Sequence, residues 1–176
     1  MRVIDALSMN VPFIKTIHSS GGMLMQLQDE GILISIDGLL TAEQLLSGAS
    51  LETQAAFKQI QKEEDLGANT LVYAFGDKVD KIYLHLTGHL VQISDLSEYL
   101  AIDTANAGKT RIYGLIEALS DKPHKTGMKT VTKCTFCVVR RSDFFKFLRE
   151  NPSVSYRLAE KLGRSYRQAI EKLRSH

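Results

Sequence analysis

The sequence predicts a mainly β protein with flanking helices, a β-sandwich or β-roll that ends in a long C-terminal helix. Three observations support this fold class. Short runs of alternating apolar residues, separated by glycines, recur from Leu71 to Ile102. A glycine turn at Gly114 precedes a short apolar helical run. A continuous apolar stripe with helical spacing occupies the last part of the chain, from Val154.

Length and composition narrow the possible function classes. The chain has 176 residues with 44% hydrophobic content, which is enough for one domain with a core. Its net charge of +2 does not indicate a broad nucleic-acid surface. No signal-peptide core and no long apolar run are present, so we expect a cytoplasmic protein without membrane insertion.

The first 43 residues are expected to form an N-terminal extension to a domain at 44–176. Within the extension, Met23–Gln28 and Ile32–Asp37 are two apolar runs across a short turn, which predicts a hairpin. Thr41 is the predicted N-cap of a short helix, and Ser50 that of a second. The second helix is expected to fade within 61–65.

Alternating residues predict strands at 71–75, 82–86, 90–93 and 99–102, with a turn at Gly76-Asp77. A further strand is predicted over Met128–Val139.

Two helices are predicted to close the chain. Ser142 is the expected N-cap of the first, and the Asn151-Pro152-Ser153 segment separates it from the last. The apolar stripe of the last helix is longer than one small domain needs, which favours a dimerisation helix. The alternative is a helix packed on its own domain. The stripe comprises Val154, Leu158, Leu162, Ser165 or Tyr166, Ala169 or Ile170, and Leu173.

The Gly114 turn and the loop after it carry the candidate binding residues. A glycine turn into a helix leaves backbone N–H groups unpaired, and these attract anions. Lys125, beside the hydroxyl of Thr126 and the small Gly127, could add a positive charge to a phosphate-sized cradle. The alternative is an ordinary surface turn with an incidental lysine.

Enzymatic and metal chemistry have weaker support. Cys134 and Cys137 are three apart in a predicted strand, so they should point to opposite faces and not chelate one metal. His85 and His89 lack the paired spacing and glutamate partner of a metal-dependent β-roll enzyme. Glu117 has no obvious second carboxylate for acid–base catalysis. We therefore expect no catalytic residues, no metal and no cofactor.

The order of these elements resembles the cyclic-nucleotide-binding domain of bacterial catabolite-activator and Fnr-like proteins. The resemblance covers roughly residues 45–173. The residues that carry it are Gly76-Asp77, Tyr83-Leu84, Leu86, Gly88, the segment Gly114-Leu115-Ile116-Glu117-Ala118-Leu119-Ser120, Arg141-Ser142-Asp143-Phe144 and Asn151-Pro152. It implies a β-roll of the double-stranded β-helix or jelly-roll type.

The resemblance also implies a ligand and its contacts. The segment from Gly114 would hold the cyclic phosphate through Gly114, Leu115, Ala118 and Leu119, and Glu117 would accept the ribose hydroxyl. Lys125, Thr126 and Gly127 stand where the family has arginine, a small hydroxyl residue and alanine. The last helix would cover the base, with Ser165, Tyr166, Arg167 and Gln168 as candidates.

Two departures from the family keep a second function open. The Gly-Glu pair is absent, and lysine replaces the arginine whose fork matches two phosphate oxygens. The first hypothesis is a stand-alone regulatory homodimer that senses a cyclic mononucleotide, with cAMP favoured over cGMP, and signals to an effector protein. The second is a nucleotide-free dimeric scaffold, its pocket filled by Met128 and Tyr113. Because no helix-turn-helix follows the last helix in this sequence, direct DNA binding is not expected.

Overall fold

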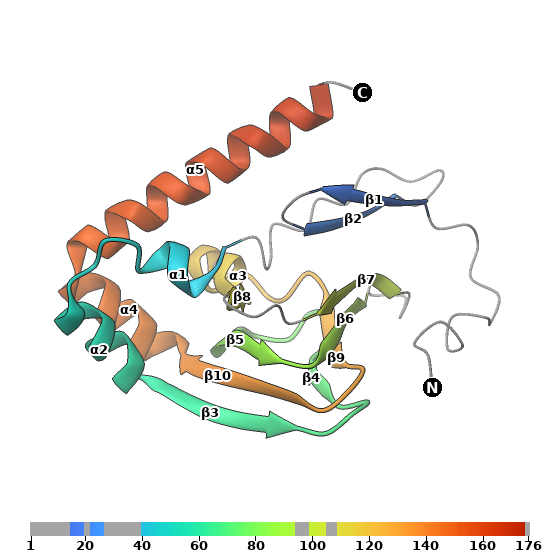
Figure 1. The fold of residues 1–176 in the computed structure, drawn as a ribbon, viewed down its shortest axis with the longest axis horizontal. Helices are drawn as coiled ribbons and strands as arrows, with labels where there is room; N and C mark the ends of the chain where they lie inside the picture. The colour runs from blue at the N-terminus through green and yellow to red at the C-terminus, as the bar shows by residue number, and fades with distance from the viewer. Residues whose placement is uncertain (1–14, 20–21, 27–39, 94–98, 105–108, 175–176) are drawn as a thin grey trace.

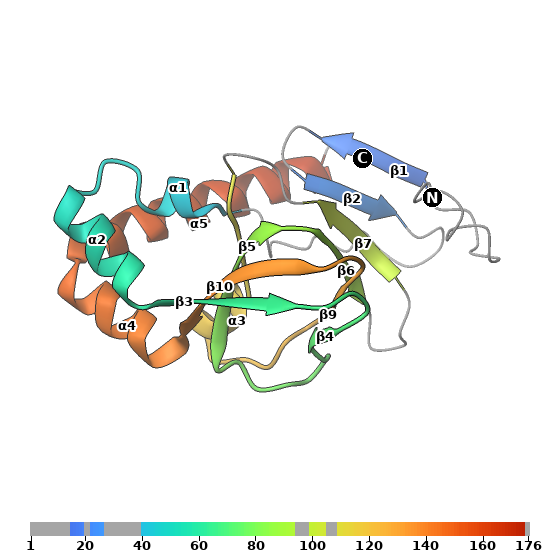
Figure 2. The ribbon, with the colours of Figure 1, turned by 60° about the horizontal axis from the view of Figure 1, so that its bottom comes forward.

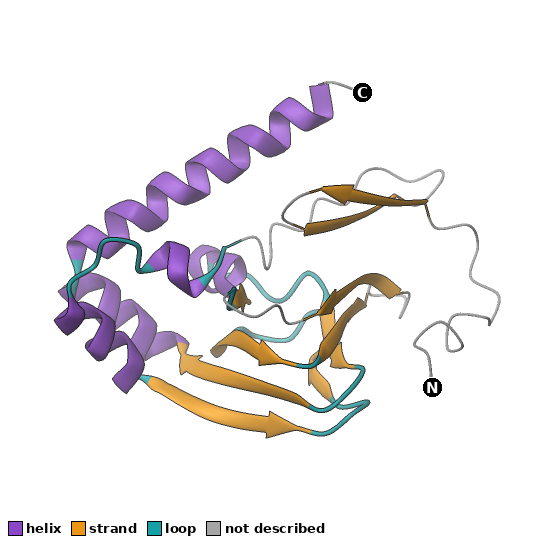
Figure 3. Ribbon diagram, viewed as in Figure 1, coloured by secondary structure: helices purple, strands orange, loops and turns teal. Residues whose placement is uncertain are grey.

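The computed structural model describes residues 15–19, 22–26, 40–93, 99–104 and 109–174. In this part of the chain, antiparallel strands form a two-layered roll, and helices gather at one end of it (Figures 1 and 3). This arrangement confirms the predicted fold class.

Two four-stranded antiparallel sheets make up the roll. The first has the order β3 (Gln61–Leu66), β10 (Cys134–Arg140), β5 (Lys81–Thr87) and β8 (Arg111–Tyr113). The second has the order β4 (Leu71–Tyr73), β9 (Gly127–Thr130), β6 (His89–Ile93) and β7 (Tyr99–Thr104). Strands β5 and β6, which follow one another in the chain, therefore belong to different sheets.

Gly88 makes the passage from β5 to β6 possible. Its φ is +95°, and a Cβ atom added there would lie 2.4 Å from the backbone oxygen of Lys133. Only glycine fits at this corner. On the opposite side of the same corner, the predicted strand Met128–Val139 is divided into β9 and β10, which pair in different sheets.

The five helices of the described chain are α1 (Ala42–Leu45), α2 (Leu51–Gln59), α3 (Leu115–Ser120), α4 (Arg141–Glu150) and α5 (Pro152–Arg174). Strand β10 separates two hydrophobic clusters. Phe136 and Val138 face a cluster within the roll, whereas Val139 faces a cluster shared with the helices. The helices thus pack on the outer face of the first sheet at one end of the roll.

Two local predictions were confirmed and one was wrong. Thr41 caps α1 in a capping box with Gln44, and Ser50 caps α2. Ser142 was expected to cap α4, but the helix begins at Arg141, two residues earlier than predicted, and its N-cap Arg140 makes no side-chain cap. The difference follows from β10, which continues to Arg140 and leads directly into α4.

The expected helical tail at 61–65 is instead strand β3. Its residues are mostly charged, but they pair with β10 at the edge of the sheet, where outward side chains remain in water. Ion pairs join Glu64 to Lys81 at 3.7 Å and Asp65 to Lys133 at 2.7 Å. Tertiary pairing therefore overrides the local pattern.

An N-terminal hairpin lies before the domain. β1 (Lys15–Ser19) pairs with β2 (Gly22–Gln26), so the first predicted strand is the second strand of this hairpin. The other predicted strand, residues 32–37, lies outside the described residues. β2 contacts β7, and the hairpin lies alongside it in Figure 2.

Helix α5 packs on the domain only through its first part. Val154 and Leu158 are buried in the core shared with the helices, and Leu162 packs against its edge. Tyr166 is 63% exposed, and the second half of α5 extends away from the sheets (Figure 1). Among the described helices, none is long and apolar enough to cross a membrane.

Candidate functional site

The candidate site begins where strand β8 turns into helix α3. Gly114 occupies the N-cap of α3 with φ +74°. A Cβ atom there would lie 3.1 Å from Cε1 of His124 and 3.3 Å from the backbone oxygen of Lys81. The positive φ and the close neighbours both require glycine. No side chain caps this helix start.

The side chains of α3 divide between packing and the candidate site. Leu115 and Ala118 are buried in the core shared with the helices, and Leu119 packs against it. Any contact that these three residues make with an anion must therefore come from their backbone. Glu117 is also buried, and its Oε2 atom has no hydrogen-bond partner among the described residues. An unpaired buried carboxylate oxygen is costly, which makes it a candidate ligand acceptor.

The loop 121–126 is fixed by His124, a residue that sequence analysis did not select. The imidazole ring stacks on Tyr73, and its side chain is only 4% exposed. Its backbone N–H donates to the Asp77 carbonyl at 2.9 Å, and its carbonyl accepts from the Gly76 N–H at 2.8 Å. Burial lowers the pKa of His124 to about 4, although nearby Asp77 opposes this shift. The ring is therefore neutral near pH 7.

Lys125, the predicted source of positive charge, directly follows His124 in the chain. Lys125 is exposed, Thr126 is half-buried, and Gly127 is buried at the start of β9. A Cβ atom on Gly127 would meet Ile93 and Phe75 at 3.5 Å. The structure thus joins α3 to this loop through Gly114 and His124, and it leaves the Lys125 side chain in solvent.

The two predicted residues of the last helix lie apart from this region. Ser165 is half-buried and Tyr166 is exposed, both in the second half of α5. That half is separated from α3 in Figure 1, and the main contacts of α5 with other helices are with α4 and α1. In this conformation, the structure does not bring Ser165 and Tyr166 to the start of α3.

Arg141 supports the far end of α3. Its Nε donates to the Ala118 carbonyl at 3.0 Å, and its guanidinium pairs with Asp121 at 2.9 Å. The same group lies 5.1 Å from the centroid of the Phe145 ring. The spacing of four residues between Arg141 and Phe145 was the one signal in the sequence. His124, a lone histidine in a polar loop, gave none.

The side chains of Cys134 and Cys137 point to opposite faces of β10, as predicted. Cys134 packs in the cluster within the roll, and Cys137 packs against the helix side of β10. Burial raises the pKa of both thiols. No group of three or more His, Cys, Asp or Glu side chains that could hold a metal ion occurs in the described part of the chain.

Solved structures share this fold. The Thermus thermophilus catabolite activator protein has a TM-score of 0.63 at 19% identity, over 74% of this chain and 61% of that protein. The N-terminal domain of a Streptomyces coelicolor A3(2) transcriptional regulator has a TM-score of 0.62 at 17% identity, over 75% of this chain and 92% of that one. The cAMP-bound PfPKA-R structure has a TM-score of 0.57 at 16% identity, over 74% of this chain and 44% of that one.

Neither a family model nor a curated protein matches the chain in sequence. The structural likeness therefore establishes the fold of cyclic-nucleotide-binding domains. The chain spans less than two thirds of the Thermus protein.

Proposed function

We propose that this protein is a cytoplasmic regulatory module, not an enzyme, that binds a cyclic mononucleotide at α3 and the loop 121–126. The observation that carries the proposal is the unpartnered Oε2 of buried Glu117, on a helix that starts at a positive-φ glycine. A ribose hydroxyl would satisfy this oxygen. The fold supports the same conclusion, because a neighbour of this fold is described as cAMP-bound.

Each proposed contact has a physical role. The first N–H groups of α3, which have no intrahelical acceptor, would face the cyclic phosphate. Lys125, from an exposed position next to fixed His124, would add its charge as a point contact without the fork of an arginine. We favour cAMP over cGMP because the resemblance noted in the sequence is to a family whose commonest bacterial ligand is cAMP.

Signalling would use the second half of α5. Tyr166 is exposed there and Ile170 is half-buried, so this half can pack against a second copy of the chain, or move over a bound base with Ser165 and Tyr166. A ligand shifts such a helix between two positions only by its difference in affinity for them. The output would pass to an effector protein through the dimer surface.

A second function, a nucleotide-free dimeric scaffold, is favoured by a different observation. Met128 and Tyr113, the side chains expected to fill the pocket in that case, are 0% and 2% exposed. His124 also packs closely against Gly114. Under this hypothesis, the protein's own side chains fill the interior of the roll in place of a ligand.

Isothermal titration with cAMP and with cGMP distinguishes the two functions. Micromolar or tighter binding should weaken at least about tenfold in Glu117→Gln and in Lys125→Ala, because each loses a charge-assisted contact. Glu63→Gln on β3 and Lys58→Ala on α2 change exposed residues outside the proposed site and serve as matched controls. Absence of heat and of a thermal shift at millimolar nucleotide would refute the sensor proposal and leave the scaffold.

Analytical ultracentrifugation tests the proposed dimer. The protein should sediment as a dimer, and Tyr166→Asp should shift it toward monomer because the charge would be desolvated at the interface. Lys161→Asp, also on α5, provides a charge-changing comparison in its first half. Monomeric wild-type protein at micromolar concentration would contradict the dimer proposal.

A further inference from the structure

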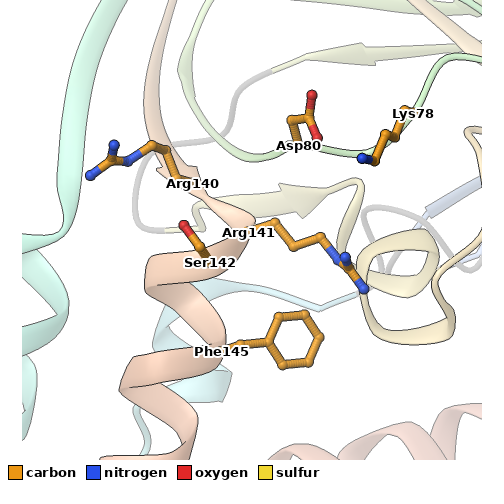
Figure 4. Close-up of a pocket in the computed structure, with 6 residues that line it drawn as sticks. All are labelled: Lys78, Asp80, Arg140, Arg141, Ser142 and Phe145. Atoms are coloured by element: carbon orange, nitrogen blue, oxygen red, sulfur yellow. The ribbon is translucent and has the colours of Figure 1, made fainter.

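A cavity of about 500 Å³, largely open to solvent, lies where the β4–β5 connection meets the start of α4 (Figure 4). This volume is typical of small-molecule sites. The cavity is lined by Lys78, Asp80, Arg140, Arg141, Ser142 and Phe145. The proposed nucleotide contacts on α3 and at Lys125 to Gly127 are not among these residues.

The lining carries an excess of positive charge. Three cations and one carboxylate leave a net charge of +2. The Arg140 side chain points away from Lys78 and Arg141 in Figure 4, and it pairs with Asp143 at 2.8 Å. The Lys78 and Arg141 side chains extend from opposite sides of the view in Figure 4 toward the space between them. Lys78 has no ion pair with any described residue, so its charge is available to a ligand.

Arg141 is held in position yet retains free donors. Its Nε is bonded to Ala118 O, one Nη2 contact goes to Asp121, and Phe145 supports the guanidinium. A guanidinium has five N–H donors, so these contacts leave donors for an oxyanion. Because the Asp121 side chain is 80% exposed, its ion pair with Arg141 is weak and an incoming anion can replace it at low cost.

The backbone keeps the two sides of the cavity together. The N–H of Arg141 donates to the Asp80 carbonyl at 2.8 Å, which fixes the β4–β5 connection against α4. The half-buried Phe145 adds an apolar wall beside Arg141. A ligand that fits this lining has a dianionic head and an apolar body.

We propose that this cavity binds a small phosphate monoester, with its phosphate between Lys78 and Arg141 and its organic part toward Phe145. A phosphate monoester carries a charge of about −1.5 to −2 near pH 7, which the two cations Lys78 and Arg141 would together balance. Since Arg141 also holds the Ala118 carbonyl, an occupant of the cavity acts on the C-terminal end of α3. The proposal does not depend on nucleotide binding at the other end of that helix.

The test is an NMR titration of the ¹⁵N-labelled full chain with phenyl phosphate, at an ionic strength kept constant with chloride. We expect saturable shifts of the Ser142, Asp143 and Asp121 amides. Lys78→Gln should weaken binding at least about tenfold, whereas Lys58→Gln, an exposed lysine on α2, should leave it unchanged. Arg141→Lys keeps the charge but loses the fork, and it should also weaken binding.

Three results would overturn the proposal: shifts that do not saturate, equal weakening by the two lysine-to-glutamine variants, or saturable shifts confined to the start of α3 and the loop 121–126. The last result would place the phosphate in the proposed nucleotide site. Lys78 is an exposed residue, so its variant should fold normally, and the spectrum itself reports on this.

Discussion

His124 and Tyr73 stack face to face, with ring centroids 3.7 Å apart and an interplanar angle of 10°. The contact joins the loop before β9 to strand β4, and the same imidazole packs against Gly114 at the start of α3. One neutral side chain thus connects three segments of the candidate site. Its removal should loosen all three.

His124→Ala should lower the free energy of unfolding by about 2–3 kcal/mol, since it leaves a cavity and removes an aromatic pair. Urea unfolding followed by circular dichroism measures the loss. His124→Phe keeps the stack and should stay within about 1 kcal/mol of the wild type. An alanine variant as stable as the wild type would show that the stack contributes nothing.

Acid should destabilise the protein through His124. Its pKa is lowered from 6.5 to about 4 in the folded state, so between these values the unfolded chain binds the proton more readily. The contribution is complete above pH 6.5 and falls by up to about 3 kcal/mol as the pH drops to 4. Urea unfolding of the wild type and of His124→Phe at pH 7 and pH 4.5 isolates this contribution from that of the carboxylates. Parallel losses in both proteins would argue against it.

Two glycine-to-alanine changes should have opposite effects. At Gly114, the positive φ and a Cβ 3.1 Å from His124 should cost at least about 1–2 kcal/mol. At Gly163, inside α5, a Cβ meets nothing within 4 Å, and alanine should stabilise the protein by about 0.5–1 kcal/mol. Thermal unfolding of both variants measures the contrast. Equal effects at the two positions would mean that Gly114 is not conformationally required.

Arg141→Met should destabilise the end of α3, because the Ala118 carbonyl loses its charged donor. We expect a loss of about 1–2 kcal/mol in stability, with faster hydrogen exchange in α3. The neighbouring Arg140 is 75% exposed and pairs with Asp143, so Arg140→Met should change stability by less than about 1 kcal/mol. Unchanged exchange in α3 would contradict the role of Arg141.

Shortening a side chain to alanine should have different effects on stability in the two halves of α5. Leu158 is 4% exposed in the core, so Leu158→Ala should cost about 2–4 kcal/mol. Tyr166→Ala should cost less than about 0.5 kcal/mol at concentrations where the protein is monomeric. Denaturant unfolding at low protein concentration provides the comparison. A large loss for Tyr166→Ala in the monomer would mean that this half also packs on its own domain.

Local signals in the sequence were reliable where both partners lie within a few residues. The caps at Thr41 and Ser50 and the turn at Gly76-Asp77 each depend on a side chain or a φ angle that the sequence itself specifies. The strand β3 could not be predicted in this way. Its pairing partner β10 lies about 70 residues further along the chain, and its charged residues carry no alternating apolar signal.

For the candidate site, the sequence alone determined the residue types: the glycine at the start of α3, the glutamate within it and the lysine in the loop. Only the tertiary structure decided what surrounds them. The Tyr73–His124 stack, the Arg141–Ala118 hydrogen bond and the cavity beside Lys78 each join segments from different strands or helices. Such contacts depend on how the two sheets and the helices pack together, which no local pattern of residues specifies.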